Sequence, residues 1–350
     1  MNNKNIFLKR FIVVITLILI LVTSFTIYIF YNRIYEPNIN LSYKDKIYVY
    51  IPSNSNFEDV QNILIKSGVL INSSSFKWVA EKKNYINKVK PGKYLVSNSM
   101  SNNDLVNLLR SGKQTPVNVM FNNIRTVEQF SQRISSQLEM DSLELINKIY
   151  DAKFLKKLNL NKQNISSLFI PNTYEFYWNV SVDKFLNKMV KEYKSFWNFN
   201  RLSKAKKIDL SKTEVTILAS IVEKETIKKD EQPKVAGLYM NRLNQDIKLE
   251  SDPTVIFAIG DFSIRRVLNK DLKFKSPYNT YLNKGLPPGP ISFPSIQAID
   301  AVLNYEEHNY IFMCAKDDFS GYHNFSTTYF GHLKNARKYR RALNRRGVKR

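Results

Sequence analysis

The sequence predicts an α+β protein with a single N-terminal transmembrane helix, a small α/β subdomain and a larger mixed α+β domain. Near the N-terminus, a run of about 20 residues carries no charge, which is enough for one helix to span a bilayer. Beyond it, patterns typical of short strands alternate with patterns typical of amphipathic helices, and Pro, Gly and Asn separate them. The 350 residues are 43% hydrophobic, so two or three domains with buried cores can form.

The formal net charge of +23 is compatible with a nucleic-acid-binding protein. The basic residues, however, are dispersed among Asn, Ile, Ser and Tyr, as in the product of an AT-rich coding sequence, and they form no early patch. We therefore expect general attraction to an anionic envelope surface and no specific nucleic-acid binding.

The cysteine and histidine residues show no spacing typical of a metal site. Cys314 is the only cysteine, so the chain can form neither an intramolecular disulfide nor a zinc site built from several thiolates. The histidines lack a recognisable ligand spacing, so we expect no metal and no cofactor; they are His308, His323 and His332.

The uncharged run is Phe11–Phe30, and three basic residues precede it. We predict an uncleaved transmembrane helix over residues 11–31 in the cell inner (plasma) membrane, with residues 1–10 in the cytoplasm and the rest periplasmic or extracytoplasmic. A removed signal peptide is the alternative. Signal peptides have a shorter apolar core and a small-residue cleavage site, whereas this run ends in interfacial aromatic residues, namely Tyr28, Phe30 and Tyr31.

Residues 32–45 are predicted to form a polar connector, and residues 46–115 a small α/β subdomain. Strand patterns occur at Lys46–Ile51 and at Lys93–Val96. Helix patterns separate and follow these strands: one passes through Val60 and stops near Gly68, and the others cover Ser75–Lys82 and Asn103–Arg110.

Residues 116–343 are predicted to form the larger domain, and residues 344–350 a frayed, solvated basic tail. Before a central helix, we predict a strand at Val117–Phe121 and helices that begin at Thr126, cover Asp141–Lys157 and cover Val182–Phe199. After it, we predict helices at Val235–Leu243, after Asp252 and at Gly331–Leu343, and paired strands at Tyr310–Ala315 and Tyr322–Phe325.

The central helix is the stretch VTILASIVEKET, Val215–Thr226. Ser211 stands three residues before Glu214, which is the spacing of a capping box at a helix start. Three apolar residues and one acid share a face at i, i+3, i+4 and i+7: Leu218, Ile221, Val222 and Glu225. Glu223 is turned away from this face by roughly 200°. The apolar stripe that should face the core therefore ends in the carboxylate of Glu225.

A carboxyl group at the rim of an apolar face is partly desolvated, which raises its pKa and keeps it protonated nearer neutral pH. A protonated carboxyl can act as a general acid, and this makes Glu225 a candidate catalytic residue. The alternative is that Glu225 is a solvated or salt-bridged residue at a helix end.

Four motifs occur in order: ASIVEKET, SDPTVIFAIG at 251–260, SPYNTYLNKGLPPGPI at 276–291 and GYHNFSTTY at 321–329. Together they resemble the MltG/YceG family of membrane-anchored endolytic murein transglycosylases. The resemblance implies that the second glutamate of EKE, Glu225, is catalytic. It also implies that residues 46–115, with KPGKY and LLRSGK, are a LysM-like glycan-binding subdomain, for which a spacer or packing platform is the alternative. FIPNTYEFY at 169–177 departs from the family pattern at Asn172, where an Asp is usual.

Candidate substrate-binding residues follow the central helix. Asp252 and Thr254 lie at a predicted helix N-terminus, whose amides suit polar ligands, although capping that helix would also explain Asp252. Sugars stack on aromatic faces and hydrogen-bond to amides, so we also select Tyr278, Asn279 and Tyr281. His323 is a further polar candidate, with a structural role as the alternative.

We therefore predict a lytic transglycosylase that cleaves the β-1,4 bond between N-acetylmuramic acid (MurNAc) and N-acetylglucosamine (GlcNAc) within glycan strands. It would leave 1,6-anhydroMurNAc ends and terminate or trim nascent strands. Its partners would be peptidoglycan strands and the plasma membrane, with peptidoglycan synthases as candidates. Two alternatives are a non-catalytic cell-wall-binding anchor and a hydrolase, which needs a second carboxylate from among Glu175, Glu250 and Asp252.

Overall fold

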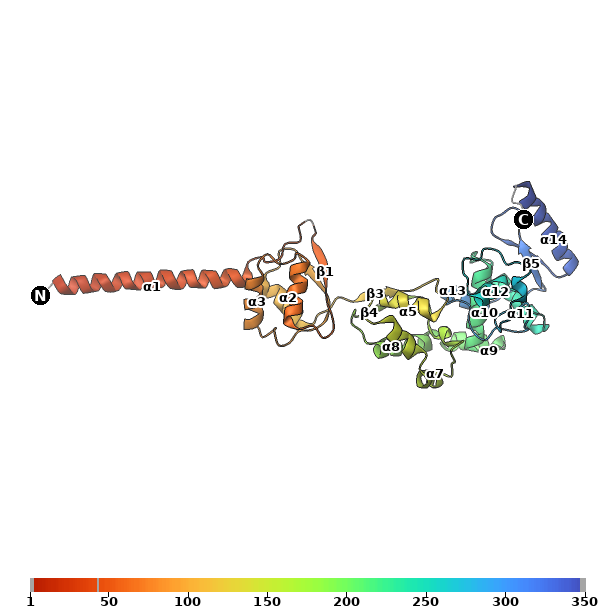
Figure 1. Cartoon of the computed structure of the whole chain (residues 1–350), viewed down its shortest axis with the longest axis horizontal. Helices are drawn as coiled ribbons and strands as arrows, with labels where there is room; N and C mark the ends of the chain where they lie inside the picture. Colours follow the sequence, from red (N-terminus) through yellow and green to blue (C-terminus); the bar gives the residue numbers. More distant parts are fainter. Residues whose placement is uncertain (1–2, 43, 347–350) are drawn as a thin grey trace. The chain divides into compact units, whose positions relative to one another are not determined.

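The structure, a computed structural model, describes residues 3–42 and 44–346 (Figure 1). By its internal contacts the chain divides into two compact units. The first comprises Met1–Val117 and Glu175–Asn179, and the second comprises Asn118–Tyr174 and Val180–Arg350. Helices surround small two-stranded sheets, which confirms the predicted α+β class.

The first unit begins with the long helix α1 (Asn3–Tyr35). From Ile6 to Tyr35 this helix is long and apolar enough to cross a membrane, and it is the one such helix in the described part of the chain. The last turns of α1 contact the rest of this unit. Phe30 stacks on Trp78 with ring centroids 5.3 Å apart, and the Asn102 amide donates a 2.9 Å hydrogen bond to the Arg33 carbonyl.

The remainder of the first unit contains a two-stranded antiparallel sheet and three covering helices. Strands β1 (Lys46–Ile51) and β2 (Gly92–Ser97) pair antiparallel, with Lys46 opposite Ser97 and Ile51 opposite Gly92. Val49 and Ile51 are buried on one face of β1, as the period-two alternation of a half-buried strand requires. The covering helices are α2 (Phe57–Lys66), α3 (Ser73–Lys82) and α4 (Asn102–Ser111).

Strands β3 (Val117–Met120) and β4 (Thr173–Phe176) form a two-stranded sheet, and the division of the chain into units falls within both strands. The second unit continues with short helices. The helices are α5 (Val127–Ser135), α6 (Ser142–Ile149), α7 (Ala152–Leu158), the 3-10 turn η1 (Ile165–Leu168), α8 (Val182–Phe196) and α9 (Phe199–Lys207).

Two of the predicted helices are wrong in extent. The single helix predicted over Asp141–Lys157 is two helices, because the Asp151 carboxylate accepts a hydrogen bond from the Phe154 amide and starts α7 anew. Likewise α8 ends at Phe196, and the Asn198 side chain caps the unpredicted helix α9. In both cases a capping side chain inside an apolar pattern interrupts the helix.

Helix α10 (Lys212–Glu225) is the centre of the second unit. The predicted capping box between Ser211 and Glu214 is present. Every residue from Val215 to Val222 is buried, so the helix is buried on all sides rather than on the one stripe that its periodicity predicts. The second covering face comes from α13 (Ile296–Leu303), a helix not predicted after the proline-rich loop, which packs against α10.

Helices α11 (Gln232–Asn244) and α12 (Asp252–Ile259) also pack against α10. The remaining elements are the 3-10 turn η2 (Asp271–Lys273), the antiparallel strands β5 (Phe312–Ala315) and β6 (His323–Ser326), and α14 (Tyr329–Arg345), which packs against both strands. Because α14 continues through Arg345, the first residues of the predicted tail are helical, and residues 347–350 lie outside the described residues.

Candidate active site

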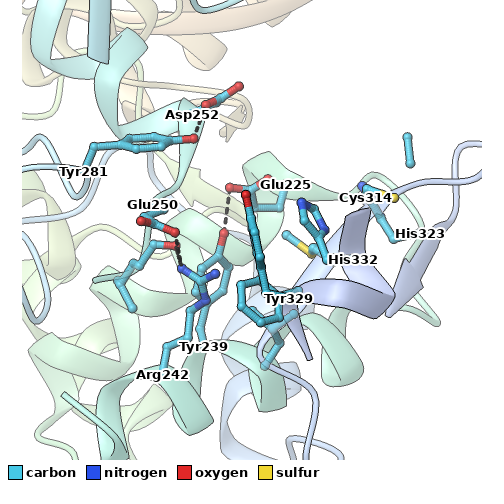
Figure 2. A pocket seen from close by; sticks show the side chains of 15 residues that line it. Glu225, Tyr239, Arg242, Glu250, Asp252, Tyr281, Cys314, His323, Tyr329 and His332 are labelled. Carbon is cyan, nitrogen blue, oxygen red and sulfur yellow. Dashed lines mark hydrogen bonds and ion pairs between the residues drawn. The ribbon is translucent and has the colours of Figure 1, made fainter. Parts of the chain in front are cut away.

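A cavity of about 420 Å³ lies at the end of α10 in the second unit (Figure 2). Its lining side chains come from α10, α11, the loop before α12, the β5–β6 hairpin and the first turn of α14. The polar and aromatic members labelled in Figure 2 are Glu225, Tyr239, Arg242, Glu250, Asp252, Tyr281, Cys314, His323, Tyr329 and His332.

Glu225 is the last residue of α10, and its half-buried carboxyl group lines the cavity. The helix ends here because Thr226 adopts an extended backbone. One carboxylate oxygen, Oε1, accepts a 2.8 Å hydrogen bond from the Tyr239 hydroxyl and a short hydrogen bond from the Ser251 hydroxyl. The second oxygen, Oε2, receives neither of these hydrogen bonds.

Burial raises the pKa of Glu225, and the neighbouring charge of Asp252 acts in the same direction. The hydrogen bonds from Ser251 and Tyr239 and the proximity of His323 oppose the shift, but the net direction is upward. The position at a helix C-terminus, where backbone carbonyls carry partial negative charge, also disfavours the carboxylate. Glu225 therefore retains its proton at a higher pH than a solvated glutamate.

The two hydroxyl donors also determine which oxygen carries that proton. Tyr239 is buried, and burial raises the pKa of its phenol, so it stays a neutral O–H donor. Ser251 is wholly buried. Because both hydroxyls donate to Oε1, the acid proton belongs on Oε2. The carboxyl group is held in one orientation, with one oxygen for structural hydrogen bonds and one for proton transfer.

Asp252 and Tyr281 both line the cavity and contact each other. The Tyr281 hydroxyl donates a 2.6 Å hydrogen bond to Asp252 Oδ1, and burial raises the pKa of this phenol. Asp252 is the first residue of α12, whereas the N-cap is Ser251. Of the predicted substrate-binding residues, Asp252, Tyr281 and His323 therefore share the cavity with Glu225.

The other three predicted substrate-binding residues do not line this cavity. Thr254 is wholly buried, and its hydroxyl donates to the Ser251 carbonyl and contacts the Thr280 hydroxyl. Asn279 is also wholly buried and fastens its own loop through the carbonyls of Leu272 and Phe274. The ring of Tyr278 packs against Phe257 in a tilted arrangement, with ring centroids 4.8 Å apart.

Arg242 holds the loop that carries Ser251. The guanidinium is buried and donates to the backbone carbonyls of Lys248, Leu249 and Ile311 at 2.7–3.1 Å. It also forms a 2.9 Å ion pair with Glu250. Glu250 has a φ of +53°, a left-handed conformation that costs free energy in a residue with a side chain. Arg242 thus stabilises a strained turn directly before the hydroxyl that contacts Glu225.

The carboxylates weighed for a hydrolase occupy different places. Glu175 is not among the residues that line the cavity. Glu250 lines the cavity but is paired with Arg242. Asp252 also lines it, and its charge acts on the pKa of Glu225. Asp252 is therefore the remaining candidate for a second catalytic carboxylate.

Glu223 has a structural contact instead. Its Oε1 accepts a 3.0 Å hydrogen bond from the amide of Ser295, the N-cap residue of α13. Asn172, the departure from the family pattern, accepts a hydrogen bond from the adjacent Thr173 amide and is not part of the cavity. Within the described residues, no group of three or more His, Cys, Asp and Glu side chains is placed to hold a metal ion.

The site residues that the sequence predicts do not include Tyr239, Arg242, Ser251 or Glu231. Ser251 begins the SDPTVIFAIG motif, whereas Tyr239 and Arg242 lie within the helix predicted at Val235–Leu243. Each of these three residues contacts a partner that is distant in the sequence. Tyr239 and Ser251 lie 14 and 26 positions from Glu225, and Arg242 lies 69 positions from Ile311. Neither periodicity nor local spacing reveals such contacts.

The sequence profile of the YceG-like family matches residues 49–338. The chain belongs to the YceG-like family. It is 27% identical over 328 residues to the endolytic murein transglycosylase of Bacillus subtilis (strain 168), covering 89% of each chain. It is also 27% identical over 309 residues to a protein of the same name from Streptococcus pneumoniae serotype 2 (strain D39 / NCTC 7466), covering 79% of this chain and 55%, about half, of that relative.

A solved structure shares the fold of this YceG-like chain. The crystal structure of a YceG-like protein from Listeria monocytogenes is 28% identical in sequence and superposes with a TM-score of 0.54. The match covers 83% of this chain and 99% of the Listeria chain. The comparison extends over most of the polypeptide and agrees with the mixed α+β architecture.

Proposed function

We propose that this YceG-like protein is a membrane-anchored lytic transglycosylase that cleaves peptidoglycan glycan strands internally. The observation that carries the proposal is Glu225, a carboxyl group with a raised pKa, fixed by two hydroxyl donors and lining a cavity large enough for sugar rings. The relatives named endolytic murein transglycosylase support the same activity.

The proposed reaction needs one acid that later acts as a base. Glu225 Oε2–H protonates the oxygen that links MurNAc to GlcNAc, and the GlcNAc unit leaves with that proton. The resulting carboxylate accepts the proton of the muramyl 6-hydroxyl as this oxygen bonds to C1. The product is a 1,6-anhydroMurNAc end, and no water is consumed. An intramolecular nucleophile has a high effective concentration, so no second carboxylate is needed to activate water.

The products of purified full-length protein test this proposal. We expect polymeric glycan strands to shorten through internal cuts and to gain anhydromuramyl ends, which mass spectrometry separates from reducing ends by the mass of one water. Size-exclusion chromatography should show fragments of intermediate length early in the digestion. Release of only single disaccharide units would contradict internal cleavage.

A hydrolase is the second candidate, and the observation that favours it is Asp252 in the same cavity. A second carboxylate could act as a nucleophile or activate water, and the products would then carry reducing ends. Against this, Asp252 already accepts a hydrogen bond from Tyr281. The end-group measurement separates the two reactions.

The domain assignment is likewise a proposal. We assign residues 46–115 to a LysM-like glycan-binding subdomain and residues 116–343 to the catalytic domain. A cavity of about 410 Å³ between the turn after β1 and helix α2, lined mostly by Ser, Asn, Asp and Lys residues, supports glycan contact in the first unit. We further propose that the protein terminates or trims nascent strands and cooperates with peptidoglycan synthases.

We predict a single membrane crossing with the N-terminus in the cytoplasm and the catalytic domain outside. The apolar part of α1 and the basic residues before it, Lys9 and Arg10, motivate this orientation. Protease added to intact spheroplasts should digest the bulk of the chain and leave a short membrane-bound stub. Full protection of the chain would contradict the orientation, and release of the uncut chain in soluble form would contradict the anchor.

Tyr239→Phe is predicted to move the pH dependence of activity upward. The hydroxyl stabilises the carboxylate form of Glu225, so its removal raises the pKa of this acid. Because the protonated form is active, activity falls as pH rises through that pKa, and the alkaline limb should shift up by about one unit or less. The measurement is kcat/KM against pH, and a downward shift would show that Tyr239 acts in another way.

A further inference from the structure

Glu231 is a buried carboxylate for which the proposed reaction has no use. It lies directly before α11, and its side chain is 5% exposed. Its Oε1 accepts the backbone amide of His323 at 2.7 Å, and its Oε2 lies 2.8 Å from His323 Nδ1 and accepts the Thr226 hydroxyl at 2.9 Å. Two of these contacts hold the backbone and the ring of one residue, His323.

The charge on Glu231 determines the tautomer of the His323 imidazole. Burial alone would raise the pKa of Glu231, but the hydrogen bonds that it accepts from the side chain and backbone of His323 and from the Thr226 hydroxyl outweigh burial, and the pKa is lowered. Glu231 is thus an ionised acceptor. A carboxylate can only accept, so Nδ1 of His323 must carry the hydrogen between them.

The other ring nitrogen of His323 is then the one available to a bound molecule. His323 lines the same cavity as Glu225 (Figure 2), and no residue within the described ranges is hydrogen-bonded to its Nε2. In the neutral ring Nε2 has a lone pair and accepts hydrogen bonds. The same carboxylate also binds Thr226, the residue after Glu225, so it ties the end of α10 to strand β6.

We propose that Glu231 is a positioning residue that holds His323 in the Nδ1–H form, so that Nε2 accepts a hydrogen bond from a hydroxyl group of the bound glycan. This inference rests on the proposed function, since it takes the glycan as the occupant of the cavity. The cavity then offers the sugar a matched pair of groups, the Glu225 Oε2–H donor and the His323 Nε2 acceptor. This role is separate from the proton transfers of Glu225.

Nuclear magnetic resonance of the full chain in detergent micelles, with nitrogen-15 in histidine alone, tests the tautomer. Only three histidines contribute, and His323→Gln identifies the signals of His323. We expect the Nδ1–H form in the parent and a mixed or reversed tautomer in Glu231→Gln. Soluble uncross-linked glycan strands, added to protein carrying Glu225→Gln to prevent turnover, should shift the Nε2 signal.

Kinetics provides the second readout. Loss of one hydrogen bond to substrate predicts a 3- to 10-fold rise in KM, as a rough estimate, for both Glu231→Gln and His323→Gln, with a smaller change in kcat. Asp230→Asn is the matched control, because this neighbouring carboxylate contacts the Tyr322 hydroxyl and does not line the cavity. It should leave both KM and the His323 tautomer unchanged.

Several outcomes would overturn the proposal. These are an Nε2–H tautomer in the parent, an Nε2 signal insensitive to glycan, or an unchanged KM in His323→Gln. If Glu231→Gln does not fold, His323→Gln and the parent spectrum still decide the matter. Failure of the proposed function would look different: parent protein would release no anhydromuramyl ends, whatever the tautomer of His323.

Discussion

Replacing Glu225 with Gln is expected to reduce the release of anhydromuramyl ends by on the order of 10²–10⁴-fold or more, because the amide cannot transfer a proton. The fold should be retained. The Gln oxygen can still accept the hydrogen bonds that Tyr239 and Ser251 now donate to Oε1, and the amide nitrogen replaces only Oε2. Binding of glycan strands should persist. Turnover is measured by mass spectrometry of end groups, and folding by thermal unfolding of the same preparation.

Glu223→Gln is the matched control on the same helix. Its Oε1 accepts the Ser295 amide, and a Gln oxygen can do the same, so most of the activity should remain. If Glu223→Gln were inactive and Glu225→Gln active, the helix-face argument would be wrong although the family membership would stand. If neither substitution affected the release of ends, the anchor without catalysis would become the better account of this site.

Arg242→Met is expected to cause the largest loss of stability, on the order of 3 kcal/mol or more. The variant keeps an apolar side chain of similar length but leaves three backbone carbonyls and the Glu250 carboxylate without their donor. Leaving a buried acceptor unsatisfied costs about 1–3 kcal/mol each. For a unit of this size, the melting temperature should fall by about 6–12 °C.

Activity should fall as well at temperatures where Arg242→Met remains folded, because the Glu250–Ser251 turn beside Glu225 loses its support. Asp246→Asn is the comparison, since it breaks the exposed ion pair with Lys284. Exposed pairs contribute little, so its melting temperature should stay within about 2 °C of the parent. A similar small shift in Arg242→Met would show that the clamp around this arginine contributes no stability.

The sequence predicts the elements whose signals are local. The bounds of β1, the last residue of α3 and the capping box of α10 follow from strand alternation and from polar caps before apolar runs, whereas α3 begins two residues before its predicted start. The sequence does not predict helix α13, because the helix has only eight residues and follows a proline-rich loop, and two turns are too few for its periodicity to stand out. That omission also explains why α10 was expected to be buried on one side only.

The residues of the candidate site also differ in whether a local sequence signal predicts them. Glu225 could be selected from its place on a helix face and from a motif, both of which are local. Thr254 and Asn279 were selected for their residue types near a motif, yet tertiary packing buries them and uses their polar groups within the loops. The contacts of Ser251 and Glu231 depend on the meeting of distant segments, which no spacing in the sequence encodes.

Digestion of polymeric murein glycan by the full-length protein in water labelled with heavy oxygen tests whether Glu225 alone drives an intramolecular cleavage in which water takes no part. We expect anhydromuramyl ends that contain no heavy oxygen, and we expect these ends to be lost in Glu225→Gln. New reducing ends that each contain one heavy oxygen atom would contradict this expectation and would indicate a hydrolase, with Asp252 as the first residue to replace.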